Sequence, residues 1–220
     1  WRVAAAPGPP SPPLRPHVVP LVGGQALAQV LVNGGPIAVA VLAAPGEEAA
    51  SGRFLAALLI ARIPLFFFQA VQSSLLPGLA RLEAVGDRAG FIDLVRRLTA
   101  LVVGLGLLAV AGSWALGPWA VRLGFGPSFA LGRRDLALLA AAAGAVMLAH
   151  VLAHAAIALA GHVRVTAGWA VGVAVAAVVV AAGDDLVLRV ELALVAGSLA
   201  TAGAHGTSRR RRLAGWSAAG

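Results

Sequence analysis

The chain has 220 residues, of which 60% are hydrophobic and only 12% are charged, and its net charge is +8. An ordinary soluble domain is about 25% charged, so this composition excludes a water-soluble globule of this size. The absence of cysteine excludes disulfides and thiolate metal sites. Every basic residue is arginine. The arginines lie at the ends of apolar runs, which favours membrane orientation over nucleic-acid binding.

The apolar runs define the expected architecture. Residues 1–16 are rich in proline and predict an extended linker. Six apolar stretches follow, each near the roughly 20 residues needed to cross a bilayer, and lipid requires such segments to be helical. We therefore predict an all-α polytopic membrane protein, with a bundle of about six transmembrane helices over 17–206 and a basic cytoplasmic tail over 207–220. The predicted spans are 18–43, 54–79, 98–121, 136–160, 165–182 and 186–204.

The first span carries three amide side chains on one face. Gln25, Gln29 and Asn33 are separated by four residues each, which places them in line on a helix. Two interpretations stand. The amides either hydrogen-bond to neighbouring helices, or line a water-filled cavity. We expect the sequence Gly34-Gly35-Pro36 to interrupt the helix after them.

The second span contains a cation inside the apolar region. Arg62 lies roughly 12 Å from the predicted start of this span, and no acidic residue occurs in the same span. Its side chain either snorkels to the outer interface or meets an anionic ligand. Further polar residues follow at helical spacing, namely Gln69, Gln72 and Ser73.

The segment from Arg81 to Arg97 alternates charged and apolar residues at helical spacing. This pattern predicts an amphipathic helix lying at the membrane interface, broken at Gly86 and Gly90.

Three ionisable residues lie in the later spans. His150 and His154 are four residues apart, but a zinc site needs further ligands, and no Asp, Glu or Cys is near them in sequence. We expect a polar patch there, and neither a metal nor a cofactor. Glu191 is expected to pair with Arg189 or with an arginine of a neighbouring outer loop. The chain contains no catalytic motif, so we expect a protein that is not an enzyme.

Three motifs, the first of them in the second span, follow one another in an order that points to a known family. The matching run starts at Arg62 within this span, has an early proline at Pro64 and contains Leu76-Pro77-Gly78-Leu79 near its end. The amphipathic segment contains Gly86-Asp87-Arg88 and Phe91, and the next span ends in Phe125-Gly126-Pro127-Ser128-Phe129. Over roughly 17–205 this order resembles the multidrug/oligosaccharidyl-lipid/polysaccharide flippase superfamily, and most closely its polysaccharide-biosynthesis members, the O-antigen and teichoic acid exporters.

The resemblance implies both a function and a missing partner. Members of this superfamily have two lobes around a central cavity, so the chain would match the second lobe and lack the first. It would flip a polyprenyl-phosphate-linked glycan across the cell membrane by rocking of the lobes. Arg62 would meet the lipid phosphates. The headgroup path would be lined by Gln25, Gln29, Asn33, Gln69, Gln72 and Ser73.

Two other functions stay open. A cation-coupled drug exporter of the same superfamily would need an acid in the membrane, and Glu191 is the available one. The other alternative is a membrane assembly subunit without transport activity, which the missing first lobe would favour if the 220 residues are the whole natural chain. The cluster from Arg209 to Arg212 after the last span predicts a cytoplasmic C-terminus, and six spans then place the N-terminus on the same side.

Overall fold

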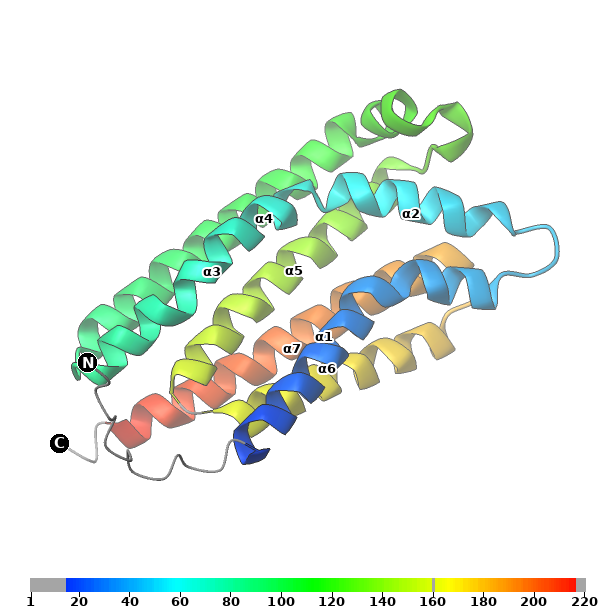
Figure 1. Ribbon diagram of the computed structural model, residues 1–220. Helices are drawn as coiled ribbons and strands as arrows, with labels where there is room; N and C mark the ends of the chain where they lie inside the picture. The colour runs from blue at the N-terminus through cyan, green and yellow to red at the C-terminus, as the bar shows by residue number, and fades with distance from the viewer. Residues whose placement is uncertain (1–14, 160, 217–220) are drawn as a thin grey trace, which may run out of the picture.

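The computed structural model describes residues 15–159 and 161–216, and this part of the chain is helical without any strand. The long helices are joined by short turns, with a 3-10 turn, η1, at Pro127–Phe129 (Figure 1). The proline-rich linker lies outside the described residues, apart from Arg15 and Pro16, which begin the first helix. The helices are α1 (Arg15–Leu42), α2 (Ala49–Ala61), α3 (Ile63–Ala84), α4 (Arg88–Phe125), α5 (Arg133–Ala158), α6 (His162–Ala182) and α7 (Leu186–Trp216).

The prediction of an all-α bundle with about six spans is confirmed. Five helices are long and apolar enough to cross a membrane, and the bent pair formed by α2 and the start of α3 makes a sixth. The chain is thus a membrane protein whose elements are transmembrane helices.

Two helices form the centre of the bundle. α5 packs against α4, α3, α2 and α7, while α7 packs against α5, α6 and α1 (Figure 1). α5 is the most buried of the spans, and it approaches α4 closely where two glycines meet. A Cβ added to Gly106 would lie 3.3 Å from the Cα of Gly144, so the small residues allow the two backbones to touch.

The second predicted span is not one straight helix. It breaks at Arg62, and α2 and α3 meet there at an angle of 52°. Pro64 explains the break, because proline lacks the N–H that would continue the ladder and its ring crowds the carbonyl of the residue four positions earlier. The helix also begins at Ala49 rather than at residue 54, so Arg62 lies about 20 Å from its start.

Two other expectations about helix breaks are wrong. α1 continues through Gly34 and Gly35 to Leu42, with Pro36 inside it. The segment from Arg81 to Arg97 is not a separate interfacial helix; it is a hairpin in which α3 ends at Ala84 and α4 begins at Arg88. The turn depends on Gly86, whose φ is +72°, a conformation that L-residues rarely adopt. Gly90 lies inside α4, where its N–H donates to the Asp87 carboxylate.

The helix ends show how far the spans extend beyond the predicted limits. α4 has 38 residues, and α7 continues to Trp216, so the arginine cluster lies on the helix rather than after it. The beginning of α1 and the end of α7 lie at the same end of the bundle (Figure 1).

Candidate functional site

The polar face of α1 is exposed on the described chain. Gln25, Gln29 and Asn33 are all exposed, because the α1 helix is continuous and keeps them in line. The Asn33 amide nitrogen donates to the Gln29 side-chain oxygen at 2.6 Å. Amides that face outward in the middle of a span need a partner beyond this bundle or water, since lipid cannot satisfy them.

Arg62 extends this hydrogen-bonded row across to the second span. Its Nη1 donates to the Asn33 side-chain oxygen at 3.2 Å, so two successive hydrogen bonds run from Arg62 to Asn33 and from Asn33 to Gln29. Arg62 is half-buried at the break between α2 and α3. No described carboxylate lies within ion-pair distance of it. The guanidinium is therefore compensated by one neutral amide and keeps other N–H groups available.

The remaining predicted site residues do not join this row. Gln69 is exposed on α3, while Gln72 turns toward α5, where its amide nitrogen is 3.4 Å from Nδ1 of His150. The side chain of Ser73 lies outside the described residues. The structure thus divides the predicted set into a row on α1 and Arg62, and a second polar contact between α3 and α5.

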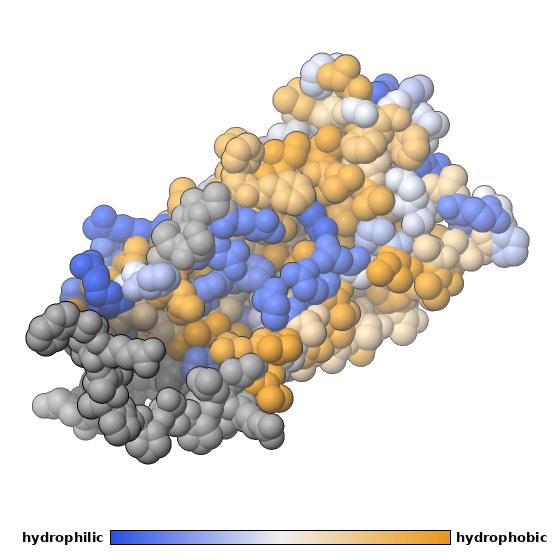
Figure 2. Space-filling view, in the orientation of Figure 1, coloured by the Kyte–Doolittle hydropathy of each residue, from blue (hydrophilic) through white to orange (hydrophobic). Residues whose placement is uncertain are grey.

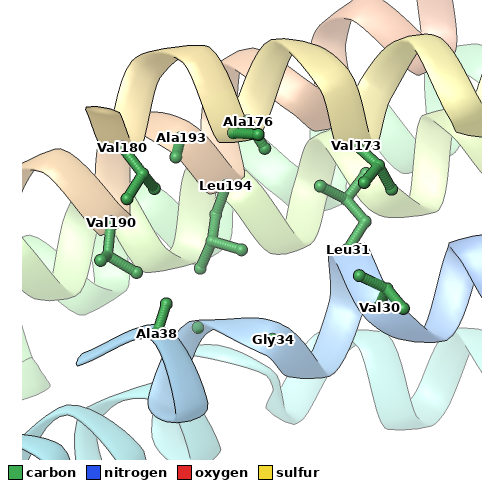
Figure 3. Close-up of a pocket in the computed structure, with 12 residues that line it drawn as sticks. Val30, Leu31, Gly34, Ala38, Val173, Ala176, Val180, Val190, Ala193 and Leu194 are labelled. Carbon is green, nitrogen blue, oxygen red and sulfur yellow. The ribbon is translucent and has the colours of Figure 1, made fainter. Parts of the chain in front are cut away.

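Hydropathy separates the two sides of α1. Figure 2 shows a hydrophilic band along the middle of the face that carries α1 and α3, with hydrophobic surface beside it. The opposite side of α1 forms an apolar groove of about 340 Å³ with α6 and α7 (Figure 3). Val30, Gly34 and Ala38 contribute to it from α1, and at about 100° per residue they lie roughly 100° to 180° around the helix from Gln29. α1 thus presents a wholly apolar side and a polar side.

His150 takes part in an aromatic cluster between α5, α6 and α7. Its ring centroid is 5.1 Å from that of Trp169, and Trp169 is 5.4 Å from His205 in an edge-on arrangement. His154 instead places its Nδ1 2.6 Å from the His150 carbonyl oxygen on its own helix. Over the described ranges, no group of three or more His, Cys, Asp or Glu residues gathers in a way that could hold a metal ion.

Glu191 does not make the expected ion pair. Arg189 donates instead to the Gly183 carbonyl oxygen at 3.3 Å, and the Glu191 carboxylate is completely buried. Neither of its oxygens has a hydrogen-bond partner among the residues that the structure describes. The prediction of a pair with Arg189 is therefore wrong.

Glu191 belongs to a polar stripe on α7 that the sequence analysis missed. The buried polar or charged residues of the described chain all lie on this helix: Glu191, Ser198, Thr201, His205 and Ser208. We call them the α7 stripe. Their intervals of seven, three, four and three residues carry a helical signal, but the abundant alanine and glycine around them looked like ordinary close packing.

Comparison with known proteins gives distant relatives. No family model matches the chain, and no solved structure does. Uncharacterized protein Rv1510 of Mycobacterium tuberculosis is 28% identical over 204 residues, which cover 89% of this chain and 44% of the relative. Uncharacterized protein Rv3630 of the same species is 28% identical over 177 residues, which cover 80% of this chain and 40% of the relative.

A relative in Mycobacterium bovis, uncharacterized protein Mb3654, matches to the same extent as Rv3630. The chain therefore spans less than half the length of the curated relatives it matches.

Proposed function

We propose that this chain is one lobe of a flippase of the multidrug/oligosaccharidyl-lipid/polysaccharide superfamily, which moves a polyprenyl-phosphate-linked oligosaccharide or polysaccharide precursor across the cell membrane. The observation that carries the proposal is the Arg62 guanidinium, which lies at a helix break deep in the span with a neutral amide as its partner. An arginine at the centre of a membrane costs about 2.5–3.5 kcal/mol on insertion scales, and binding of an anion would offset that cost.

The chemistry of Arg62 favours a phosphate. A guanidinium can bind a phosphate through two parallel N–H bonds, and the bond to Asn33 uses only one of its N–H groups. The exposed amides of Gln25 and Gln29 then offer hydrogen bonds to sugar hydroxyls beside that phosphate. Such a path needs no covalent chemistry, since the substrate changes only its side of the membrane.

The exposed polar face supports a second lobe. A row of amides that faces lipid is costly, whereas the same row lining a wet cavity between two lobes is satisfied. The relatives support this arrangement too, because more than half of each relative lies outside the matched region and leaves room for another lobe. Rocking of the two lobes would expose the cavity to each side in turn.

Substitution of Arg62 in the full transporter tests the proposal. Arg62→Ala should abolish glycan export, and Arg62→Lys should impair it, because an ammonium cannot reproduce the paired bonds to phosphate. Export and membrane abundance are measured together in cells. Arg122→Ala is the matched control, since Arg122 is an exposed arginine near the end of α4. Normal export by a well-inserted Arg62→Ala protein would overturn the proposal.

One observation favours a second function, the cation-coupled export of a drug. Such an exporter needs an acid within the membrane, and Glu191 is a fully buried carboxyl group. Uptake of a fluorescent organic cation by vesicles carrying the full transporter distinguishes the two functions. Drug transport that is lost in Glu191→Gln and kept in Arg62→Ala would favour the exporter.

We also propose that both termini face the cytoplasm. The beginning of α1 and the end of α7 lie at the same end of the bundle, and Arg209 and Arg210 are at that end of α7 (Figure 1). Two reporters are fused after Gly220, one that is active only in the cytoplasm and one that is active only outside it. The cytoplasmic reporter alone should be active, and activity of the other would reverse the orientation.

A further inference from the structure

The α7 stripe crosses most of the membrane inside the protein. Glu191 lies near its outer end and Ser208 at its inner end, about 26 Å apart along the helix axis. Every member is buried against neighbouring helices, in contrast to the exposed amides of α1. Burying an ionisable group in a span costs free energy, so the contacts around each group indicate which protonation state its site favours.

At the outer end, the site of Glu191 suits a protonated carboxyl group. The side chain is 0% exposed and both oxygens are without a hydrogen-bond partner over the described chain. Val190 and Leu194 beside it pack in an apolar cluster with Leu136 and Leu139 of α5. An ionised carboxylate in such surroundings costs far more than a neutral acid. The charged groups that act on it are Arg134 and Asp135 of α5, and Asp185 before α7.

At the inner end, the site of His205 suits an imidazolium. Nδ1 is 3.1 Å from the carbonyl oxygen of Ala149 on α5, and Nε2 is 3.1 Å from the carbonyl oxygen of Val165 on α6. Carbonyl oxygens only accept hydrogen bonds, so both ring nitrogens must donate. A neutral imidazole has a single N–H and would point a lone pair at one of the two oxygens.

The surroundings of His205 leave this geometry little freedom. The edge of the Trp169 ring contacts it from α6, and His150, on the other side of Trp169, is the titratable group that acts on it from α5. A Cβ added to Gly168 would lie 2.5 Å from Nε2, so the imidazole fits against bare backbone. The ring therefore joins α5, α6 and α7 through its two N–H groups.

Hydroxyl groups lie between the two ionisable ends. Thr201 donates to the Gly197 carbonyl oxygen at 2.9 Å, while the Ser198 hydroxyl has no partner in the described part of the chain. Ser198 borders an internal cavity of about 10 Å³ that Arg62 also lines. That volume is close to the minimum for one water molecule, and the serine and the guanidinium supply polar partners for it.

We propose that the α7 stripe is a proton-binding site of two groups, in which Glu191 holds a proton as a carboxylic acid and His205 holds one as an imidazolium. Movement of α7 that brings water to Glu191 releases its proton and leaves a carboxylate. Movement that separates His205 from either carbonyl oxygen leaves one ring N–H without an acceptor. The imidazolium then releases that proton to water and becomes a neutral imidazole. Protonation is thereby linked to the packing of α7 against α5 and α6. This inference stands apart from the proposed flippase activity, because it requires no substrate.

Nuclear magnetic resonance of the full chain in liposomes tests the proposal. Glutamate is labelled with ¹³C at the side-chain carboxyl and histidine with ¹⁵N in the ring. At neutral pH, one glutamate signal should be that of a protonated acid and one histidine should show two N–H groups. The acid signal should disappear in Glu191→Gln and persist in Glu83→Gln, because Glu83 is exposed. The imidazolium signal should disappear in His205→Asn and persist in His154→Gln.

The wild-type spectrum also decides the question if a variant fails to fold. The chain has four glutamates, and Glu47, Glu48 and Glu83 are exposed whereas Glu191 is buried. A water-soluble paramagnetic ion should therefore broaden every glutamate carboxyl signal except that of Glu191. An unbroadened signal at the position of a protonated acid supports the proposal. An unbroadened signal at the position of an ionised carboxylate, or a His205 ring with a single N–H at neutral pH, overturns it.

Discussion

Two helices of this bundle carry a row of polar residues through the membrane, and one row is exposed whereas the other is buried. On α1 the row of Gln25, Gln29 and Asn33 is exposed, and its hydrogen bonds run along the surface to Arg62. On α7 the stripe from Glu191 to Ser208 is buried among helices of the same bundle.

The difference shows what spacing alone can establish. Both rows follow a helical interval, so the sequence places each on one face of its helix. Whether that face turns inward depends on which side of the helix its neighbours pack against. α7 packs against α5, α6 and α1 and buries its stripe, whereas α1 packs against α2, α6 and α7 and leaves its amides exposed. An exposed row is available to substrate or to a second lobe, while a buried row acts within the fold.

The largest expected effect comes from pushing α6 away from the α7 stripe. A Cβ added to Gly172 would lie 2.7 Å from the Gly197 carbonyl oxygen, so Gly172→Leu forces the two backbones apart. Overpacking costs about 1–3 kcal/mol and sometimes more. Thermal unfolding in detergent should show a large loss of stability. Gly34→Leu on α1 is the control, because nothing lies within 4 Å of a Cβ there. Equal losses in both variants would remove the distinction between the helices.

The next effect is the access of water to the two rows. The chain has no native cysteine, so single-cysteine variants can be labelled without background. In the full-length protein, Gln29→Cys should react with a water-soluble maleimide at least about tenfold faster than Ser198→Cys, since a buried site reacts only after local opening. A Gln29→Cys thiol as unreactive as that of Ser198→Cys would mean that lipid or protein covers the α1 row.

A smaller effect is expected from replacing one polar group in each row with an apolar one. Glu191→Met should raise stability by about 1–2 kcal/mol, because it removes a buried polar group that lacks a hydrogen-bond partner. Gln29→Met should change stability by less than about 0.5 kcal/mol, because Gln29 is exposed. Chemical unfolding in mixed micelles measures both, and a destabilised Glu191→Met would show that the carboxyl group is satisfied.

The smallest effect concerns the loop that connects α1 to α2. The Gly46 N–H donates to the Glu48 carboxylate at 3.0 Å, and this bond chiefly lowers the Glu48 pKa from its ordinary value of 4.5. A lowered folded-state pKa contributes stability above the ordinary value, and that stability is lost as the pH falls through the folded value. The amide resonance of Gly46 should therefore shift in acid. The shift should be absent in Glu48→Gln and retained in Glu83→Gln.

Much of the fold could be predicted because lipid allows few alternatives. Long apolar runs between turn residues must be helices, and the structure has them. The breaks were harder to place. Gly34, Gly35 and Pro36 together predict an interruption, yet α1 continues, and Ser51 donates to the Pro36 carbonyl oxygen at 3.1 Å from α2. At Arg62 the span bends beside Pro64, which lacks the N–H that would continue the helical ladder.

The candidate site could be predicted only where one helix supplies it. The alignment of Gln25, Gln29 and Asn33 depends on local spacing, and the structure retains it. The bond between Asn33 and Arg62 joins residues 29 positions apart, and the contact between Gln72 and His150 joins residues 78 apart, so neither follows from local pattern. The burial of Glu191 likewise depends on the arrangement of α5 and α7, which a single sequence does not specify.

The lengths of α4 and α7 fix how thick a bilayer this protein fits. On α4, the rise from Arg97, which pairs with Asp93, to the half-exposed Trp114 is about 26 Å. On α7, the rise from Arg189 to Arg209 is about 30 Å. Both distances are close to the hydrocarbon thickness of an ordinary bilayer, about 30 Å. A sterol-rich membrane a few ångströms thicker would stretch this match at a cost of a fraction of a kcal/mol per ångström. The bundle is thus dimensioned for a bilayer of ordinary thickness, and the length of the lipid chains becomes a variable that sets how well the protein fits its membrane.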